Sequence, residues 1–165
     1  MENESFVTNS ELWRRAQAEP EPDWRDLYGH VGLRGTAADT AAECARLHKA
    51  GEPLAELWRF GVLQALDSYL SARRRGGPVL ARGVFAQEPP ATGAAEIDAA
   101  YAALAEHLAE QDGWEPATWV NDPRRRVEHW YANTPVIFRA QADEQSPKAF
   151  RTRGIFITPE ALWRA

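Results

Sequence analysis

The amino-acid sequence predicts a mainly α-helical fold: a single compact multi-helix domain with at most one or two short strands. The chain has 165 residues, 44% of them hydrophobic and seven of them Trp, which is enough for one domain with a substantial core. Most apolar residues recur three and four positions apart, as they do on one face of a helix. Only residues 155–157 have the β-branched and aromatic character of a strand.

The first two helices are expected before residue 33. Ser10 can cap a helix over residues 11–18, which ends at the Glu-Pro repeat that follows. Pro22 suits the first turn of a second helix, which continues until Gly32. Its apolar residues at helical spacing are Trp24, Leu27, Tyr28 and Val31.

The next two helices are predicted on either side of Gly51. Thr36 or Asp39 begins the first of them, and Gly51 is a natural stop. Pro53 opens the longest apolar helix, which reaches residue 75. Because its apolar residues occupy more than one face, we expect it to be central in the fold.

The Gly- and Pro-rich segment 77–92 interrupts the helical pattern and is expected to be a loop that packs against the core. It connects an N-terminal helical half, residues 1–76, to a C-terminal helical half, residues 93–165. We expect the two halves to form one folded unit.

The C-terminal half begins with an amphipathic helix from Ala94 that Gly113 ends, and its core stripe is Ile97, Tyr101, Leu104 and Leu108. Asp122–Pro123 and Ser146–Pro147 each have the arrangement of an N-cap and a first helical turn. After the strand at 155–157, Thr158–Pro159 starts a last helix over residues 160–164.

Charge is distributed unevenly along the chain. The net charge is −5, which disfavours a general nucleic-acid binder. Residues 1–26 carry seven acids and three bases, whereas residues 122–165 carry five acids and eight bases. An acidic head and a basic tail can pair within one chain, between two copies, or with another molecule.

Several features predict a bacterial cytoplasmic protein. No run of about 18 apolar residues is present to cross a membrane. The acidic, polar N-terminus is unlike a secretory or mitochondrial leader. The single cysteine, Cys44, cannot form an internal disulfide, and the richness in Ala, Arg, Gly and Pro is typical of a GC-rich bacterial genome.

No metal or cofactor is expected. The four histidines lie apart in the sequence, and the helical pair Cys44 and His48 would need two more ligands that nothing nominates. The glycines near residue 76 lack the spacing of a phosphate-binding loop. No Gly-x-Ser-x-Gly nucleophile elbow is present.

One pair has catalytic spacing, Arg124 and His129, separated by four residues. This spacing resembles the motif of HEPN-type ribonucleases, a metal-independent helical class in which Arg would hold the scissile phosphate and His would transfer a proton. That motif belongs in the middle of a long helix, whereas here it follows Pro123 directly. The alternative is a solvated basic turn with His129 beside a buried Trp130, so the sequence favours a non-enzymatic role.

Two arginine triplets could contact nucleic acid, residues 73–75 and residues 124–126. Residues 73–75 end the long helix, where they oppose the negative pole of its macrodipole. Because the first triplet has this structural explanation, the second triplet is the better candidate for contacting nucleic acid, with aromatic residues nearby on which bases could stack. A DNA-contacting transcriptional regulator is thus a further alternative. The candidates are Arg124, Arg125 and Arg126, next to Trp130 and Tyr131.

A longer pattern runs through the C-terminal half: a Trp-containing turn, Asp-Pro, an aromatic pair, then Ser-Pro-x-x-Phe-Arg-x-Arg-x-Ile-Phe and a short last helix. The matching positions are Trp119, Asp122, Pro123, Trp130, Tyr131, Ser146, Pro147, Phe150, Arg151, Arg153, Ile155 and Phe156. About residues 93–165 thereby resemble uncharacterised actinobacterial helical proteins associated with helix-turn-helix regulators and toxin–antitoxin-like genes. His129 and Tyr131 depart from the family's Pro and Phe. The resemblance implies a regulatory or antitoxin-like binding role and carries over no catalytic residue.

We therefore expect a protein that binds a protein partner or a second copy of itself. Interface hot spots are rich in aromatic residues and Arg, and residues 155–157 can add to a partner's sheet as an edge strand. The same aromatic residues can instead close the core, which would leave Arg151 and Arg153 as the exposed pair. The candidate partner-binding residues are Trp130, Tyr131, Phe150, Arg151, Arg153, Phe156 and Trp163.

Overall fold

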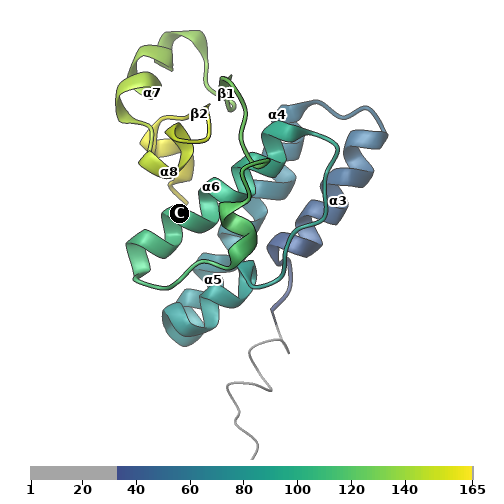
Figure 1. The fold of residues 1–165 in the computed structure, drawn as a ribbon, viewed down its shortest axis with the longest axis vertical. Helices are drawn as coiled ribbons and strands as arrows, with labels where there is room; N and C mark the ends of the chain where they lie inside the picture. The colour runs from purple at the N-terminus through teal and green to yellow at the C-terminus, as the bar shows by residue number, and fades with distance from the viewer. Residues whose placement is uncertain (1–32, 165) are drawn as a thin grey trace, which may run out of the picture. The chain divides into compact units, whose positions relative to one another are not determined.

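The computed structural model describes residues 33–164 and confirms the mainly α-helical class (Figure 1). The helices predicted over residues 11–18 and 22–31 lie outside the described residues. The elements are α3 (Ala37–Lys49), α4 (Leu54–Leu57), the π-helical η1 (Trp58–Val62), α5 (Leu63–Ala81), η2 (Arg82–Phe85), α6 (Ala95–Asp112), η3 (Thr118–Asn121), β1 (Trp130–Tyr131), η4 (Val136–Phe138), α7 (Arg139–Gln145), α8 (Lys148–Arg151), β2 (Ile155–Phe156) and η5 (Pro159–Leu162).

Helix α3 begins as predicted, and both candidate residues take part. The Thr36 hydroxyl accepts a hydrogen bond from the Asp39 amide at 3.2 Å, and the Asp39 carboxylate accepts one from the Thr36 amide at 3.0 Å. This reciprocal capping box satisfies two backbone donors that the first turn would otherwise leave unpaired. Beyond Ala50, Gly51 adopts a φ of +91°, as a helix stop requires.

The helix predicted from Pro53 is interrupted by a π-helical turn, η1, at Trp58–Val62. Gly61 lies in this turn, where a Cβ atom would come within 2.2 Å of the Cys44 sulfur and 2.7 Å of the Tyr101 hydroxyl. Such an insertion is typical of a helix that must adjust to its neighbours. Glycine at position 61 therefore lets η1 approach both α3 and α6 closely.

The segment expected to be a loop at 77–92 is helical over part of its length. Gly77 has a φ of +67°, which breaks the preceding helix, and Pro78 starts a new helical stretch that runs into η2. Proline suits this position because its fixed φ matches a first turn. The segment packs against the core as expected, since Val84 and Phe85 are buried.

Helix α6 is a central element, together with the segment predicted from Pro53, whose Leu57, Trp58 and Tyr69 are also fully buried. It contacts η1, α4, η3, α8 and β2, and it passes through the middle of the described part of the chain (Figure 1). The predicted stripe is confirmed, because its four large residues are at most 4% exposed. The remaining faces are also buried, through small side chains that let neighbouring backbones approach: Ala99, Ala100, Ala102, Ala103 and Ala105.

Strand β2 is confirmed at Ile155–Phe156, and it pairs in parallel with β1, which the sequence analysis did not predict. The Trp130 amide donates to the Gly154 carbonyl at 2.8 Å. Gly154 has a φ of +76°, and a Cβ atom there would lie 2.1 Å from the Val127 carbonyl oxygen. Only glycine permits this approach of the two chain segments.

Three predicted helix starts are wrong in detail. No helix follows Asp122–Pro123, because the Asp122 carboxylate instead accepts from the Arg124 amide at 2.9 Å and closes a turn. Ser146 does not cap α8. Its hydroxyl instead accepts a hydrogen bond from the Ile157 amide and donates one to the Ile157 carbonyl, both at 2.9 Å. The last element is the 3₁₀-helix Pro159–Leu162 instead of an α-helix over 160–164.

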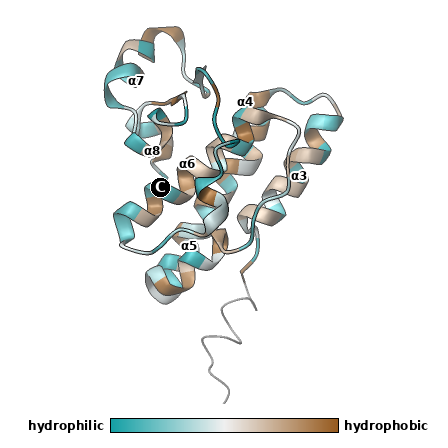
Figure 2. Ribbon diagram, viewed as in Figure 1, coloured by the Kyte–Doolittle hydropathy of each residue, from teal (hydrophilic) through white to brown (hydrophobic). Residues whose placement is uncertain are grey.

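The C-terminal tail contributes to the core. Phe150, Ile155 and Ile157 are fully buried, and the Trp58 ring meets the rings of Phe150 and Trp130 edge-on, at centroid distances of 6.3 and 5.9 Å. Figure 2 shows hydrophobic stretches on α6, α8 and the helices around them. Part of the tail is therefore core.

We expect Gly61→Ala to destabilise the protein by about 1–3 kcal/mol, because the added methyl group overpacks the contact with Cys44 and Tyr101. Urea unfolding measures this cost. In a Cys44→Ala background the sulfur is gone, so the same substitution should cost clearly less. Equal costs in the two backgrounds, within about 0.3 kcal/mol, would contradict the contact.

Candidate functional site

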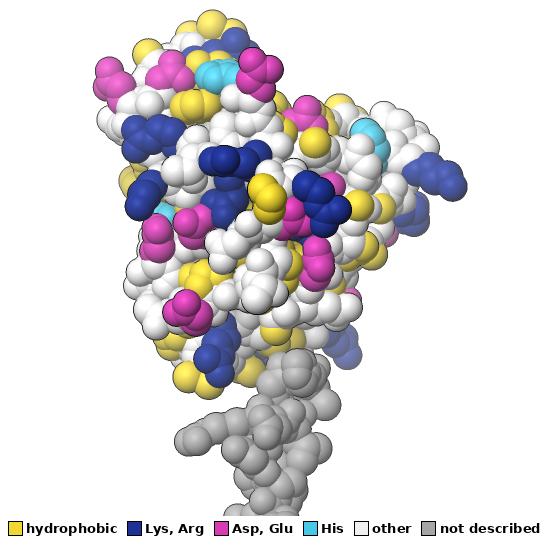
Figure 3. Space-filling view, in the orientation of Figure 1, with side chains coloured by type: hydrophobic (Ala, Val, Ile, Leu, Met, Phe, Trp, Pro, Cys, Tyr) yellow, Lys and Arg dark blue, Asp and Glu magenta, His cyan; other side chains and the backbone are white. Residues whose placement is uncertain are grey.

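The most exposed group of large apolar side chains in residues 33–164 lies between β1 and α7. Val136, Ile137 and Phe138 are 73%, 81% and 45% exposed and follow one another on the 3₁₀-helix η4. We call these three residues the apolar turn. In Figure 3, hydrophobic side chains at the top of the molecule border basic and acidic ones, over the position of α7 in Figure 1. The turn therefore presents apolar surface to solvent, directly before the exposed Arg139.

The apolar turn is held in place from both ends. Before it, the Thr134 hydroxyl donates to the Ala132 carbonyl at 2.9 Å, which fixes the chain as it leaves β1. After it, the Tyr131 hydroxyl donates to the Asp143 carboxylate at 2.7 Å and so ties α7 to β1. This hydrogen bond raises the pKa of Tyr131 above its ordinary value. The exposure of the turn is thus a fixed feature of the fold.

An aromatic cluster of His129, Tyr131 and Phe156 lies on the two-stranded sheet next to α7. The His129 ring stacks on Phe156 at a centroid distance of 4.4 Å and meets Tyr131 edge-on at 4.7 Å. The Arg139 guanidinium lies over the Tyr131 ring, 4.7 Å from its centroid. The cluster therefore joins both strands to the start of α7.

Half of the eight cations of the basic tail are paired with carboxylates within the chain. The pairs are Arg124 with Asp122, Arg125 with Glu88, Arg153 with Glu106 and Arg164 with Asp67. Four cations of residues 122–164 form no ion pair with any carboxylate of the described part of the chain: Arg126, Arg139, Lys148 and Arg151. These four carry the positive charge that remains for other molecules.

The predicted partner-binding residues separate into accessible and inaccessible groups. Arg151 is exposed and Trp163 is 73% exposed, beside a small cavity that Asp67 and Arg74 also line. Half-buried positions are occupied by Trp130, Tyr131 and Phe156. Phe150 is fully buried, so it fills the core and is not available to a partner.

Arg153 was expected to be exposed, and this prediction is wrong: only 8% of its surface reaches solvent. Its guanidinium pairs with Glu106 of α6 and donates to the carbonyls of Val120 at 2.9 Å and Ala149 at 3.0 Å. A buried charge is tolerated when its donors are satisfied in this way. Arg153 therefore holds three segments of the fold together.

The residues of the ribonuclease hypothesis occupy separate environments. Arg124 is bound to the Asp122 carboxylate by its Nε and Nη atoms, at 3.0 and 2.6 Å. These contacts lower the pKa of Asp122 to about 2. His129 belongs to the aromatic cluster, and residues 122–129 form turns and extended chain. The long helix in which that motif belongs is therefore absent from this part of the structure.

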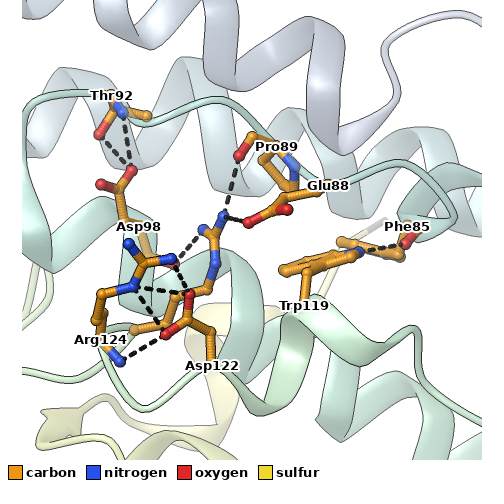
Figure 4. A network of polar contacts seen from close by, with 9 residues as sticks. Phe85, Glu88, Pro89, Thr92, Asp98, Trp119, Asp122 and Arg124 are labelled. Atoms are coloured by element: carbon orange, nitrogen blue, oxygen red, sulfur yellow. Dashed lines mark hydrogen bonds and ion pairs between the residues drawn. The ribbon is translucent and has the colours of Figure 1, made fainter.

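Arg125 is the buried member of its triplet, and Figure 4 shows the network around it. Its guanidinium lies 5.0 Å from the Trp119 ring centroid and donates to Glu88 at 3.2 Å and to the Pro89 carbonyl at 3.0 Å. The adjacent cavity, about 670 Å³, is lined by acidic residues that other groups of the chain already bind. For example, the Thr92 hydroxyl donates a hydrogen bond to the Asp98 carboxylate at 2.8 Å. The network fixes residues 88–92 against α6.

Two further predictions concern helix ends and metal ligands. Arg73 pairs with Asp112 at 2.8 Å, which links the first arginine triplet to the end of α6.

The helical pair Cys44 and His48 was the candidate pair of metal ligands. Cys44 is buried, and its thiol donates to the Leu57 carbonyl at 3.4 Å, while His48 is exposed. In residues 33–164, no three or more His, Cys, Asp or Glu side chains are grouped to hold a metal ion.

None of the helices described between residues 33 and 164 is long and apolar enough to cross a membrane.

No protein-family model matches the chain, and no curated protein or solved structure is significantly similar to it. The candidate site therefore depends on the geometry alone.

The sequence analysis missed the apolar turn and Arg139. The signal was present in Thr134–Pro135, which is followed by three consecutive apolar residues that belong to no helical or alternating stripe. Such a run is compatible with a buried strand, and only the structure shows that its three side chains are exposed to solvent.

Arg153→Met should cost about 3 kcal/mol of unfolding free energy, since it leaves Glu106 and two buried carbonyls without their partner. Arg151→Met is the matched control, because Arg151 is exposed and should change stability by no more than about 0.5 kcal/mol. Chemical denaturation of both variants tests this. Similar losses for both would contradict the assigned role of Arg153.

Proposed function

We propose that this chain is a non-enzymatic cytoplasmic protein-binding module with a regulatory, antitoxin-like role, and that the apolar turn contacts its partner. The observation that carries the proposal is the exposure of Val136, Ile137 and Phe138 side by side. Contiguous apolar groups on a surface mark interaction sites. Their burial against another protein is favourable because it removes apolar surface from water.

The surroundings of the apolar turn support this role. Arg139 follows the turn directly and lies over the Tyr131 ring, which packs against Phe156. Aromatic residues and Arg are the types enriched at interfaces. The hydrogen bonds of Thr134 and Tyr131 hold the turn before any partner arrives. A preformed surface costs less conformational entropy on binding.

The regulatory, antitoxin-like part of the proposal is supported by the resemblance of residues 93–165 to actinobacterial proteins associated with regulators. The unpaired charge on Arg126, Lys148 and Arg151 suits a partner with an acidic rim, which would steer encounter and set specificity. Placement in a reducing cytoplasm is supported by the lone cysteine, Cys44, whose side chain is fully buried.

Ile137→Asp should abolish partner binding, because it places a charge at the centre of the buried contact. The full-length chain and the variant are immobilised and exposed to lysate of the source organism, and retained proteins are quantified by mass spectrometry. We expect the protein retained stoichiometrically by the wild type to fall at least about tenfold with Ile137→Asp.

Val79→Asp is the matched control, because Val79 is also an exposed apolar residue, 63% exposed on α5, but outside the apolar turn. It should retain the same protein as the wild type. Circular dichroism checks that both variants are folded. Equal retention by a folded Ile137→Asp variant would rule out the apolar turn as the contact.

A further inference from the structure

We infer that the outer edge of β1 receives an extended segment of the partner protein, which adds to the sheet as a third strand beside Tyr131. The inference rests on the proposed function, since it names the kind of segment that binds next to the apolar turn. Its evidence is the hydrogen-bond pattern of the two-stranded sheet and the position of β1 within it.

Strand β1 binds β2 through alternate residues. The amides of Trp130 and Ala132 donate to the carbonyls of Gly154 and Phe156, at 2.8 and 3.2 Å. In such a ladder the residue between them directs its own amide and carbonyl to the opposite edge. That residue is Tyr131, and in the described part of the chain its backbone amide and carbonyl form no hydrogen bond.

The far edge of β2, in contrast, is closed. The Ser146 hydroxyl binds both the amide and the carbonyl of Ile157, and β2 contacts α6, α7 and α8. The main contact of β1 among the described elements is β2 itself, apart from the Trp130 ring, which meets Trp58 from one face of the sheet. The open edge is therefore that of β1, although the sequence alone suggested edge addition at residues 155–157.

The unpaired backbone of Tyr131 selects the type of segment that binds there. An amide and a carbonyl that point to the same side of a strand are matched by another extended chain, which offers both groups at the same spacing. A helical segment cannot supply them, because its backbone groups are already bonded to one another. The occupant is therefore an extended segment.

Side chains on one face of the sheet define the residue that would lie beside Tyr131. The rings of His129, Tyr131 and Phe156 are packed together, and the Arg139 guanidinium lies over the Tyr131 ring. Aromatic and β-branched residues form the favourable cross-strand pairs with an aromatic ring. We expect one of these at the paired position of the partner segment.

The edge is too short to bind a strand strongly without a second contact. Strand β1 has two residues and is preceded by the exposed Glu128, and short edges next to charges resist indiscriminate pairing. The apolar turn supplies the second contact. Val136 follows Tyr131 by five residues, so the two lie at most about 17 Å apart, and about five residues of extended chain can reach both.

Hydrogen exchange of the Tyr131 amide in the full-length chain, followed by NMR, tests the edge directly. In the free chain this amide should exchange quickly, while the amides of Trp130 and Ala132, which donate to carbonyls after α8, are protected. A Tyr131 amide that is already protected in the free chain overturns the inference, because another part of the chain then occupies the edge.

Random linear peptides displayed on phage serve as the probe for the added strand. Peptides selected on the full-length wild type should slow exchange of the Tyr131 amide when they bind. Tyr131→Pro, which removes this amide, should weaken their binding at least about fivefold relative to Tyr131→Ala, which keeps it. Both variants lack the phenol ring, so fluorescence anisotropy with the two isolates the backbone contribution.

Proline is tolerated at an edge position whose amide faces outward, and circular dichroism checks that both variants are folded. Equal peptide affinity of the two folded variants overturns the inference. So does a selection that yields no binding peptide, or one whose peptides leave exchange of the Tyr131 amide unchanged. The exchange measurement needs no variant, so it decides the matter even where Tyr131→Pro does not fold.

The inference and the proposed function can fail separately. A lysate partner that is lost with Ile137→Asp and retained equally by Tyr131→Pro and Tyr131→Ala would refute the added strand and leave the proposed function standing. Peptides that bind at the edge as expected, combined with a lysate partner that Ile137→Asp retains, would support the strand and count against the apolar turn as the contact.

Discussion

Close packing around α6 is the constraint on which the rest of this structure depends. The helix is buried on every side because alanines fill the positions between its large residues. Small side chains allow α4, η1, η3, α8 and β2 to reach one axis, and protein interiors tolerate few voids at such contacts. The π-helical turn at Gly61 is the adjustment that one neighbour makes to fit this arrangement.

The C-terminal third is attached to α6 by polar contacts as well as by apolar burial. Arg153, just after α8, pairs with Glu106 on α6, and Phe150 of α8 packs against Trp58. Because this attachment uses the inward side of the segment, η4 and α7 are left on the outside. The exposure of the apolar turn is thus a consequence of how the tail is anchored.

Charge pairing explains why a basic tail does not make a broadly basic surface. Four of its arginines are bound to carboxylates of the same chain, two of them in buried positions. In the described part of the tail four cations remain without a carboxylate partner, fewer than the many free cations that binding along a phosphate backbone requires.

Local signals in the sequence determined where α3 begins and where α3 and α6 end. Thr36, Gly51 and Gly113 act through backbone conformation and capping, which depend on few neighbours, and the stripe that begins at Ile97 follows from helical periodicity alone. Only the tertiary structure decided the partner of β2, the burial of Arg153 and the exposure of Ile137, since each depends on segments distant in the sequence. Burial of an arginine requires Glu106 and two carbonyls to converge on it, and no spacing along the chain encodes that convergence.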